Sequence, residues 1–176
     1  MVYGGGVRQP VKVVFYNAIL TNELLIDRVD GYLKNIFGLP VFKSNIFNFD
    51  HTNYYEDEMG ERLMKYFACY DIIDYPDRLV LFKRLAVDIE ELFMVDGKRK
   101  VNIDPGYVAL EKVVAASTKN FSHRIYLGDN IYADLQLYRK KKRFNPLPWT
   151  FYDYKTDLAL DFFEKAREYL EGCLNG

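Results

Sequence analysis

Residues able to do acid–base chemistry stand at the ends of two predicted strands in the second half of the chain. Asp104 ends a short predicted strand over 100–103 at the sharp turn Asp104-Pro105-Gly106, and His123 begins a predicted strand over 123–127. If the two strands are neighbours, the carboxylate and the imidazole meet at one end of the sheet. A carboxylate orients an imidazole for general acid–base work. We therefore predict Asp104 and His123 as catalytic residues.

Cations close to this pair in the sequence would attract an anion. Lys119 and Arg124 offer positive charge to a phosphate or carboxylate group. Ser122 and Asn102 add a hydroxyl and an amide. Adjacent residues on a strand point to opposite faces, so only one of His123 and Arg124 faces a pocket unless the strand starts with a bulge. We predict Lys119, Arg124, Ser122 and Asn102 as ligand-binding residues.

A structural role is the alternative explanation of this cluster. Asp104 can cap the turn or helix that follows it. His123 can be a hydrogen-bonded side chain at a sheet edge, and Arg124 can pair with a surface acid. Clustered polar groups raise the odds of a functional site without proving one.

An acidic and aromatic connection, DHTNYYEDEMG, occupies residues 50–60. Its carboxylates are the oxygen ligands that Mg²⁺ and Ca²⁺ prefer, but the spacing lacks the alternating ligands and central glycine of an EF-hand loop. The alternative is a solvated segment whose tyrosines pack on the core. We predict no metal site, and we predict Tyr55 and Glu58 as ligand-binding residues at the rim of the pocket.

Known catalytic motifs are missing from the sequence. There is no GxxxxGK[ST] phosphate loop, and the run Gly4-Gly5-Gly6 precedes the first predicted strand instead of following it. GxSxG, HExxH and CxxC do not occur. Two histidines are too few for a histidine-rich zinc site. The sequence therefore names no cofactor, and it does not decide whether the protein is an enzyme.

The composition indicates one soluble domain. The chain has 176 residues, of which 49% are hydrophobic, enough for one packed core. A net charge of −1 gives no global attraction to nucleic acid or to an anionic membrane. No apolar stretch is long enough to span a bilayer, and two distant cysteines fit a reducing cytoplasm. We expect a flexible leader over 1–9, a single domain over 10–176 and no membrane partner; the oligomeric state is unknown.

The order of predicted elements favours an α+β fold. Buried strands are predicted over 11–20, 41–49 and 63–73, with the short strand over 100–103 and a hairpin whose strands are 123–127 and 131–138. Helices are predicted over 24–37, 79–93 and 107–116, with a closing helix capped by Thr156. We predict a mixed or antiparallel sheet with ferredoxin-like βαββαβ elements, followed by the hairpin and the closing helix.

Two basic segments, 98–100 and 139–143, suggest a second kind of function. The second one lies at a predicted hairpin tip, near several aromatic residues in the sequence. Basic and aromatic side chains together can bind RNA, so a non-catalytic RNA-binding or protein-interaction module is the alternative to a small-molecule site. The simpler explanation is that charges at the tip protect an edge strand. The near-neutral chain makes nucleic acid the weaker partner.

Four segments carry a resemblance that covers nearly the whole chain: PVKVVFYNAIL, FNFDHTNYYEDEMG, GKRKVNIDPGYVALEKVVAASTKNFSHRIYLGDNIYADL and FNPLPWTFYDYKT. They resemble the bacterial domain-of-unknown-function family 4416. The resemblance implies a small, single-domain, cytoplasmic bacterial protein, and it brings no agreed catalytic residues. From the residues themselves we expect a protein that binds an anionic small molecule or nucleotide, with a phosphate-handling enzyme as one form of that function.

Overall fold

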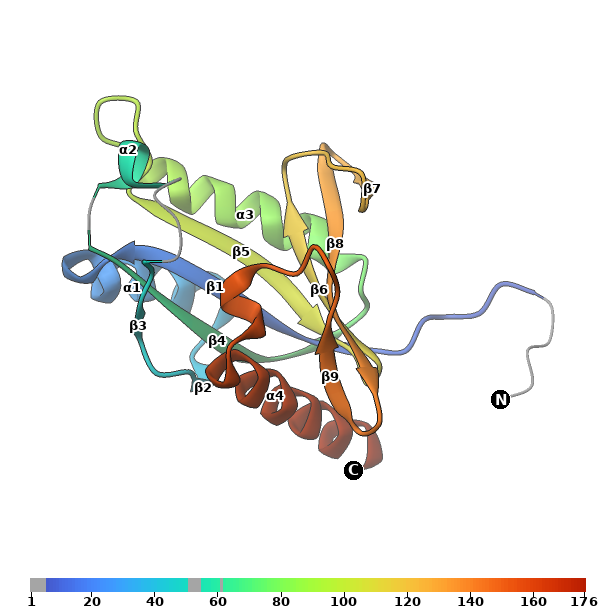
Figure 1. The fold of residues 1–176 in the computed structure, drawn as a ribbon. Helices are drawn as coiled ribbons and strands as arrows, with labels where there is room; N and C mark the ends of the chain where they lie inside the picture. Colours follow the sequence, from blue (N-terminus) through green and yellow to red (C-terminus); the bar gives the residue numbers. More distant parts are fainter. Residues whose placement is uncertain (1–5, 51–54, 61) are drawn as a thin grey trace.

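The computed structural model describes residues 6–50, 55–60 and 62–176 (Figure 1). The strands are β1 (Val13–Asn22), β2 (Pro40–Lys43), β3 (Phe47–Asn48), β4 (Leu63–Asp74), β5 (Val101–Val108), β6 (Lys112–Ser117), β7 (Arg124–Gly128), β8 (Ile131–Lys140) and β9 (Arg143–Pro146). The α-helices are α1 (Ile26–Phe37), α2 (Glu56–Met59), α3 (Arg78–Leu92) and α4 (Asp157–Asn175). Two 3₁₀ helices, η1 (Glu23–Leu25) and η3 (Tyr152–Lys155), precede α1 and α4.

The strands form one open sheet with the order β2-β4-β1-β5-β6-β8-β7. The two short strands β3 and β9 extend it by pairing with β4 and β8. Every strand pairing in the described residues is antiparallel. The predicted α+β class is confirmed, and the sheet is antiparallel rather than mixed. The finer ferredoxin-like description stays a prediction.

Helices cover both faces of the sheet (Figure 1). Strand β1 shows why, since its residues are buried on both sides and alternate between two cores. Val14 and Tyr16 pack with the apolar stripe of α4, while Phe15 packs with Leu79 of α3. Ile19 lies on the same face as Phe15 and packs against α1 and α3. The sheet is therefore the middle layer of three.

Most of the predicted elements are present. The predicted strands 11–20 and 63–73 are β1 and β4, and the predicted helices 24–37 and 79–93 are α1 and α3. The predicted strand over 41–49 is divided into β2 and β3, which both pair with β4. The 123–127/131–138 hairpin is β7–β8. Thr156 caps α4 as expected, because its Oγ1 accepts a hydrogen bond from the Ala159 N–H.

Two predictions around β5 are wrong. Asp104-Pro105-Gly106 is not a turn, because all three residues lie inside β5 and pair with β1. The stretch 107–116 is not a helix; it holds the end of β5, a tight connection and most of β6. Pro105 is tolerated because β6 pairs with β5 only from Gly106 onward.

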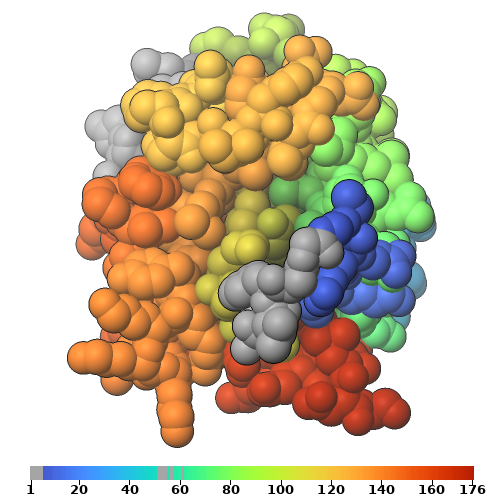
Figure 2. Space-filling view, turned by 90° about the vertical axis from the view of Figure 1, so that its right-hand side faces the viewer, coloured from blue at the N-terminus to red at the C-terminus, as the bar shows by residue number. Residues whose placement is uncertain are grey.

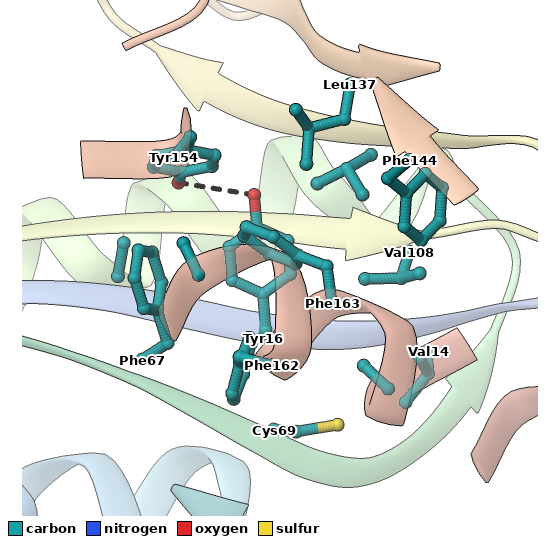
Figure 3. Close-up of a cluster of buried hydrophobic side chains, with 14 of the residues drawn as sticks. Val14, Tyr16, Phe67, Cys69, Val108, Leu137, Phe144, Tyr154, Phe162 and Phe163 are labelled. Atoms are coloured by element: carbon teal, nitrogen blue, oxygen red, sulfur yellow. Dashed lines mark hydrogen bonds between the residues drawn. The ribbon is translucent and has the colours of Figure 1, made fainter. Parts of the chain in front are cut away.

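Gly106 is required by a close approach rather than by a turn. A Cβ atom at this position would lie 2.3 Å from Cζ and Oη of Tyr16. The Tyr16 ring crosses over the strand there, and its hydroxyl donates a 3.3 Å hydrogen bond to Oη of Tyr154 (Figure 3). Phe162 and Phe163 of α4 enclose the ring edge-on. The absence of a side chain on β5 thus makes room for the centre of the α4 core.

The β8–β9 hairpin ends in the predicted basic tip. Lys140 pairs with Arg143, and the two residues between them, Lys141 and Lys142, have φ angles of 52° and 66°. Positive φ at both central residues is the geometry of a type I′ hairpin turn. The tip projects from the face seen in Figure 2, in orange at the lower left.

Residues 1–5 of the predicted leader lie outside the described part of the chain, and residues 6–9 are exposed and belong to no helix or strand. Among the described residues, no helix is long and apolar enough to cross a membrane.

Candidate functional site

The candidate site lies where the sheet divides between two neighbouring strands. β5 and β6 pair over only three residues of each strand, 106–108 with 113–115. Beyond Gly106 the strands separate, and in Figure 1 β6 runs steeply away from β5. The side of β5 that β6 leaves exposes the backbone of Ile103, which needs other partners.

Two charged side chains of α3 supply those partners. The Ile103 N–H donates a 2.6 Å hydrogen bond to Oε1 of Glu90, and Nζ of Lys83 donates a 2.7 Å hydrogen bond to the Ile103 carbonyl oxygen. Lys83 and Glu90 are both buried. They satisfy the peptide groups that a paired strand would otherwise satisfy, so β6 can diverge without leaving them unbonded.

A hollow of about 100 Å³ fills the opening between the strands. Its lining comes from α3, β5, β6, the start of β7 and the residues that precede α2, β5 and η3 or follow β6. The lining residues are Tyr55, Lys83, Glu90, Arg99, Asn102, Asp104, Ala116, Ser117, Thr118, Lys119, Arg124 and Phe151. Five of the eight predicted site residues are among them: Tyr55, Asn102, Asp104, Lys119 and Arg124. Chain segments far apart in sequence therefore meet at one solvent-connected point.

Asp104 is the acid at the centre of this site. Its Oδ1 lies 3.0 Å from Nζ of Lys83, and its Oδ2 accepts a 2.8 Å hydrogen bond from Nδ2 of Asn102. Burial alone would raise the pKa of Asp104. The charges of Lys83 and Lys65 and the two hydrogen bonds outweigh burial and hold the pKa below its ordinary value. The carboxyl group is therefore ionised at neutral pH, although 23% of its side chain still reaches solvent.

Glu90, which is buried behind Asp104 together with Lys83, has its pKa shifted upward, opposite to that of Asp104. Burial raises the pKa of Glu90, and the nearby Lys83 opposes this only in part. Burial would lower the pKa of Lys83, but the charges of Asp104 and Glu90 outweigh it and raise that pKa. Lys83 is thus protonated at neutral pH, and its ammonium group holds Asp104 in place.

Arg99 joins the predicted rim residue Glu58 to the centre of the site. Its guanidinium makes a two-pronged ion pair with Glu58, with Nε and Nη2 at 2.7 Å and 2.9 Å from the carboxylate oxygens. Nη1 donates a 3.0 Å hydrogen bond to Oδ1 of Asn102. The hydrogen bond from Arg99 lowers the pKa of Glu58. Glu58 therefore orients Arg99, which in turn orients Asn102 toward Asp104.

Arg124 is held at the opposite wall by a fully buried acid, Asp134 of β8. Its Nε donates a 2.7 Å hydrogen bond to Oδ2 of Asp134. Its Nη1 donates to Oγ of Ser117 and to the carbonyl oxygen of Lys119, both at 2.9 Å. Gln136 holds the other oxygen of Asp134 at 2.7 Å. The guanidinium is fixed in place and also ties down the loop that carries Lys119.

His123 and Ser122 stand apart from the hollow. Nε2 of His123 lies 3.4 Å from Oδ1 of Asp134, outside hydrogen-bond geometry, and the imidazole stacks on Trp149 at a centroid distance of 5.0 Å. No ion pair joins His123 to Asp104 within the described chain, and Ser122 is exposed in the preceding turn. His123 precedes β7, so strand alternation does not apply, and both it and Arg124 reach Asp134.

A second hollow of about 200 Å³ adjoins the first. It is lined by Phe49, Tyr55, Lys65, Asp104, Phe151, Tyr152 and Asp153. Asp104, Tyr55 and Phe151 border both hollows, so the two hollows are neighbours. At its base Nζ of Lys65 lies 2.6 Å from Oδ2 of Asp153, and both side chains are buried.

Sequence reasoning missed the residues that hold the site together. Lys83 and Glu90 stand on the same helical stripe as Leu79 and Ala86, and that spacing was a usable signal, because a charged residue on the core-facing stripe of a helix needs a buried partner. Asp134 offered no such signal, since it lies on a strand of mixed pattern. Arg99 looked like one member of a basic run.

Larger hollows lie elsewhere in the described chain, but the linings of three of them include none of the eight predicted residues. One of these, of about 530 Å³, is lined by residues of β1, η1, β3 and β4 and of the loops beside them. No group of three or more potential metal ligands occurs among the residues the structure describes. Residues 51–54 of the acidic connection lie outside that part of the chain.

Comparison with known families places the chain in one of them. The family described as a domain of unknown function, DUF4416, matches residues 9–169, and the chain belongs to this family. No curated protein and no solved structure matches the chain.

Proposed function

We propose that the opening between β5 and β6 binds an anionic small molecule, most simply one that carries a phosphate group. The observation that carries this proposal is the charge of the lining. Four cationic side chains, Lys83, Arg99, Lys119 and Arg124, line the hollow against two acidic ones, Glu90 and Asp104. Arginine and lysine held in fixed positions are the usual ligands of phosphate and carboxylate groups in proteins.

The predicted residues take different roles in this proposal. Lys119 and Arg124 hold the anion from the β6–β7 side. Asp104 and Asn102 orient its polar substituents, and Tyr55 forms the rim. Glu58 acts through Arg99, and Ser122 borders the loop that carries Lys119.

A phosphate-handling enzyme is the catalytic form of the proposal, with Asp104 and His123 in acid–base roles. His123 would then have to leave Trp149 and Asp134 to reach the ligand, since its imidazole does not line the hollow. Phosphate binding without turnover would leave His123 with a positioning role, because it shares Asp134 with Arg124.

Calorimetric titration with inorganic phosphate tests the proposal. The exposed Lys119 is the best position to change, because Arg124 is paired with buried Asp134 and its removal also threatens the fold. We expect Lys119→Gln to weaken phosphate binding about tenfold, the loss typical of a hydrogen bond to a charged group. Lys112→Gln is the matched control, since Lys112 is a partly exposed lysine of β6 outside the hollow. Absence of phosphate binding, or equal binding by Lys119→Gln and the parent protein, contradicts the proposal.

The basic hairpin tip favours a second function, RNA binding. Lys140, Lys141, Lys142 and Arg143 are all exposed there, and no acid of the tip lies between them. RNA affinity should fall steeply with salt, and replacing Lys141 and Lys142 by Gln should flatten the dependence of log K on log salt by about 1–2. No RNA binding at low salt contradicts this alternative.

We also propose that residues 10–176 fold as one ferredoxin-like α+β domain of a cytoplasmic bacterial protein. The sheet order β2-β4-β1-β5 supports the ferredoxin-like part, because it interleaves the strands of two βα units.

A further inference from the structure

The hollow beside the proposed anion site has the chemistry of a ring-binding pocket. We infer that the ligand is a phosphate monoester whose organic part is a flat ring with a polar edge. This inference rests on the proposed function, since the phosphate occupies the opening between β5 and β6. The ring lies in the adjoining hollow, across Asp104.

The two hollows share lining residues and together have the size of such a ligand. Asp104, Tyr55 and Phe151 line both of them. The volumes are about 100 Å³ and about 200 Å³, and together they reach the lower end of the range of about 300–1,000 Å³ typical of small-ligand sites. The smaller part suits one tetrahedral anion, and the larger part suits a single ring system.

Aromatic side chains form the walls of the larger hollow. Phe49 and Tyr55 meet edge to face, with ring centroids 5.9 Å apart and planes at 65°. Phe151 packs edge to face on Tyr154, 5.6 Å away, and Tyr152 next to it is 63% exposed. Rings of this kind attract a flat π-system more than a saturated chain of equal size.

The base of the larger hollow is polar. Nζ of Lys65 lies 2.6 Å from Oδ2 of Asp153 there, so the two side chains form a buried ion pair. Lysine offers three donors and a carboxylate offers only acceptors. A ring edge that carries both a donor and an acceptor can bond to the hydrogens and lone pairs that this ion pair leaves over, whereas an all-carbon ring edge cannot.

Calorimetry with four probes of increasing resemblance to the ligand tests the inference. The probes are inorganic phosphate, ethyl phosphate, phenyl phosphate and a pyrimidine nucleoside monophosphate, each under one salt and pH condition. We expect phenyl phosphate to bind about tenfold more tightly than ethyl phosphate because of stacking. The nucleotide, whose ring has a polar edge, should bind at least as tightly as phenyl phosphate.

A variant at the exposed wall separates ring binding from anion binding. Tyr152→Ser should bring the affinity for phenyl phosphate close to that for ethyl phosphate and leave inorganic phosphate unchanged. Tyr126→Ser is the matched control, because Tyr126 is also exposed, at 58%, and lines neither hollow. A thermal melt of each variant confirms that it is folded.

The outcomes distinguish the two levels of the proposal. Equal binding of ethyl and phenyl phosphate, together with binding of inorganic phosphate, overturns the ring inference and leaves the anion site standing. Weaker binding of the nucleotide than of phenyl phosphate overturns the polar-edge part alone. Failure of every phosphate probe to bind overturns both the ring inference and the proposed function.

Discussion

Gly106→Ala tests the packing on which the candidate site is built. The new Cβ would lie 2.3 Å from the Tyr16 ring, whereas ordinary contacts begin at 3.4 Å, so the ring or the strand must move by about 1 Å. Tyr16 has no space for this movement. It is fully buried, and its ring lies 5.1 Å from that of Phe163 and 6.3 Å from that of Phe162 (Figure 3).

The expected magnitude follows from overpacking. Forcing an extra carbon into a filled core costs about 1–3 kcal/mol, and the rigid, enclosed ring puts this case near about 3 kcal/mol. The lower entropy of the unfolded alanine chain offsets about 0.4–1 kcal/mol. A net loss of about 2 kcal/mol remains, which lowers Tm by about 4–8 °C in a chain of this size.

Urea and thermal unfolding measure this loss. Gly31→Ala is the control, because Gly31 is exposed in α1 with open space around it, and alanine there should stabilise the helix by about 0.5–1 kcal/mol. The double variant Gly106→Ala/Tyr16→Leu should lose about 1 kcal/mol less stability than the sum of the two single losses, because leucine removes the ring that the new Cβ meets. Parent-like stability of Gly106→Ala, or full additivity of the double variant, would refute the argument from close approach.

Two further predictions concern the charges of the site. Lys83→Met should destabilise the fold by about 3 kcal/mol or more in urea unfolding, because it removes the buried cation that lies between Asp104 and Glu90 and leaves the Ile103 carbonyl without its donor. Lys112→Met should cost at most about 1 kcal/mol, and equal losses would argue against the role of Lys83 in completing β5. Asp104 has a lowered pKa in the folded protein, so its stabilising contribution is complete above the unfolded pKa of about 3.9 and is lost as pH falls through the folded pKa. Urea midpoints from pH 7 to pH 3 should therefore show that the stability advantage of the parent protein over Asp104→Asn shrinks on acidification. An advantage that stays constant with pH would contradict the lowered pKa.

The amphipathic helices and the longest strands could be predicted from the sequence because local pattern and tertiary structure agree there. In α1, buried residues recur at Val29, Leu33 and Phe37, and Gly38 ends the helix with a φ of 78°. In β1, ten residues without a breaker form a strand buried on both faces. Such segments carry their own structural signal.

The segment 104–116 could not be predicted because its local signals point elsewhere. Pro105-Gly106 is typical of a turn, and the alanine-, glutamate- and lysine-containing stretch that follows is rich in helix formers. Pairing with β1 and β8 overrides both preferences. The requirement for Gly106 comes from Tyr16, ninety residues earlier in the chain, so no local rule could reveal it.

The sequence indicated several residues that line one hollow, but not the contacts between them. Asp104, Lys119 and Arg124 line that hollow, but the ion-pair partner of Asp104 is Lys83, and the acid nearest to the His123 imidazole is Asp134. The prediction linked residues through neighbouring strands, whereas the structure links them through a helix and through β8. Side-chain contacts between a helix layer and the sheet leave no periodic pattern in the sequence, so the sequence does not reveal them.

Because α3 supplies hydrogen-bond partners to β5, the sheet can open between two strands without losing backbone hydrogen bonds at the opening. Opening an ordinary sheet exposes a ladder of amides and carbonyls to whatever enters, so an interior gap weakens the scaffold. Here the amine of Lys83 and the carboxylate of Glu90, both on α3, bond to the backbone of Ile103, so this part of β5 does not need β6 as a partner. Side chains facing the gap on β6 and in the loop after it can therefore change, and with them the shape and charge of the hollow, while β5 keeps its hydrogen bonds.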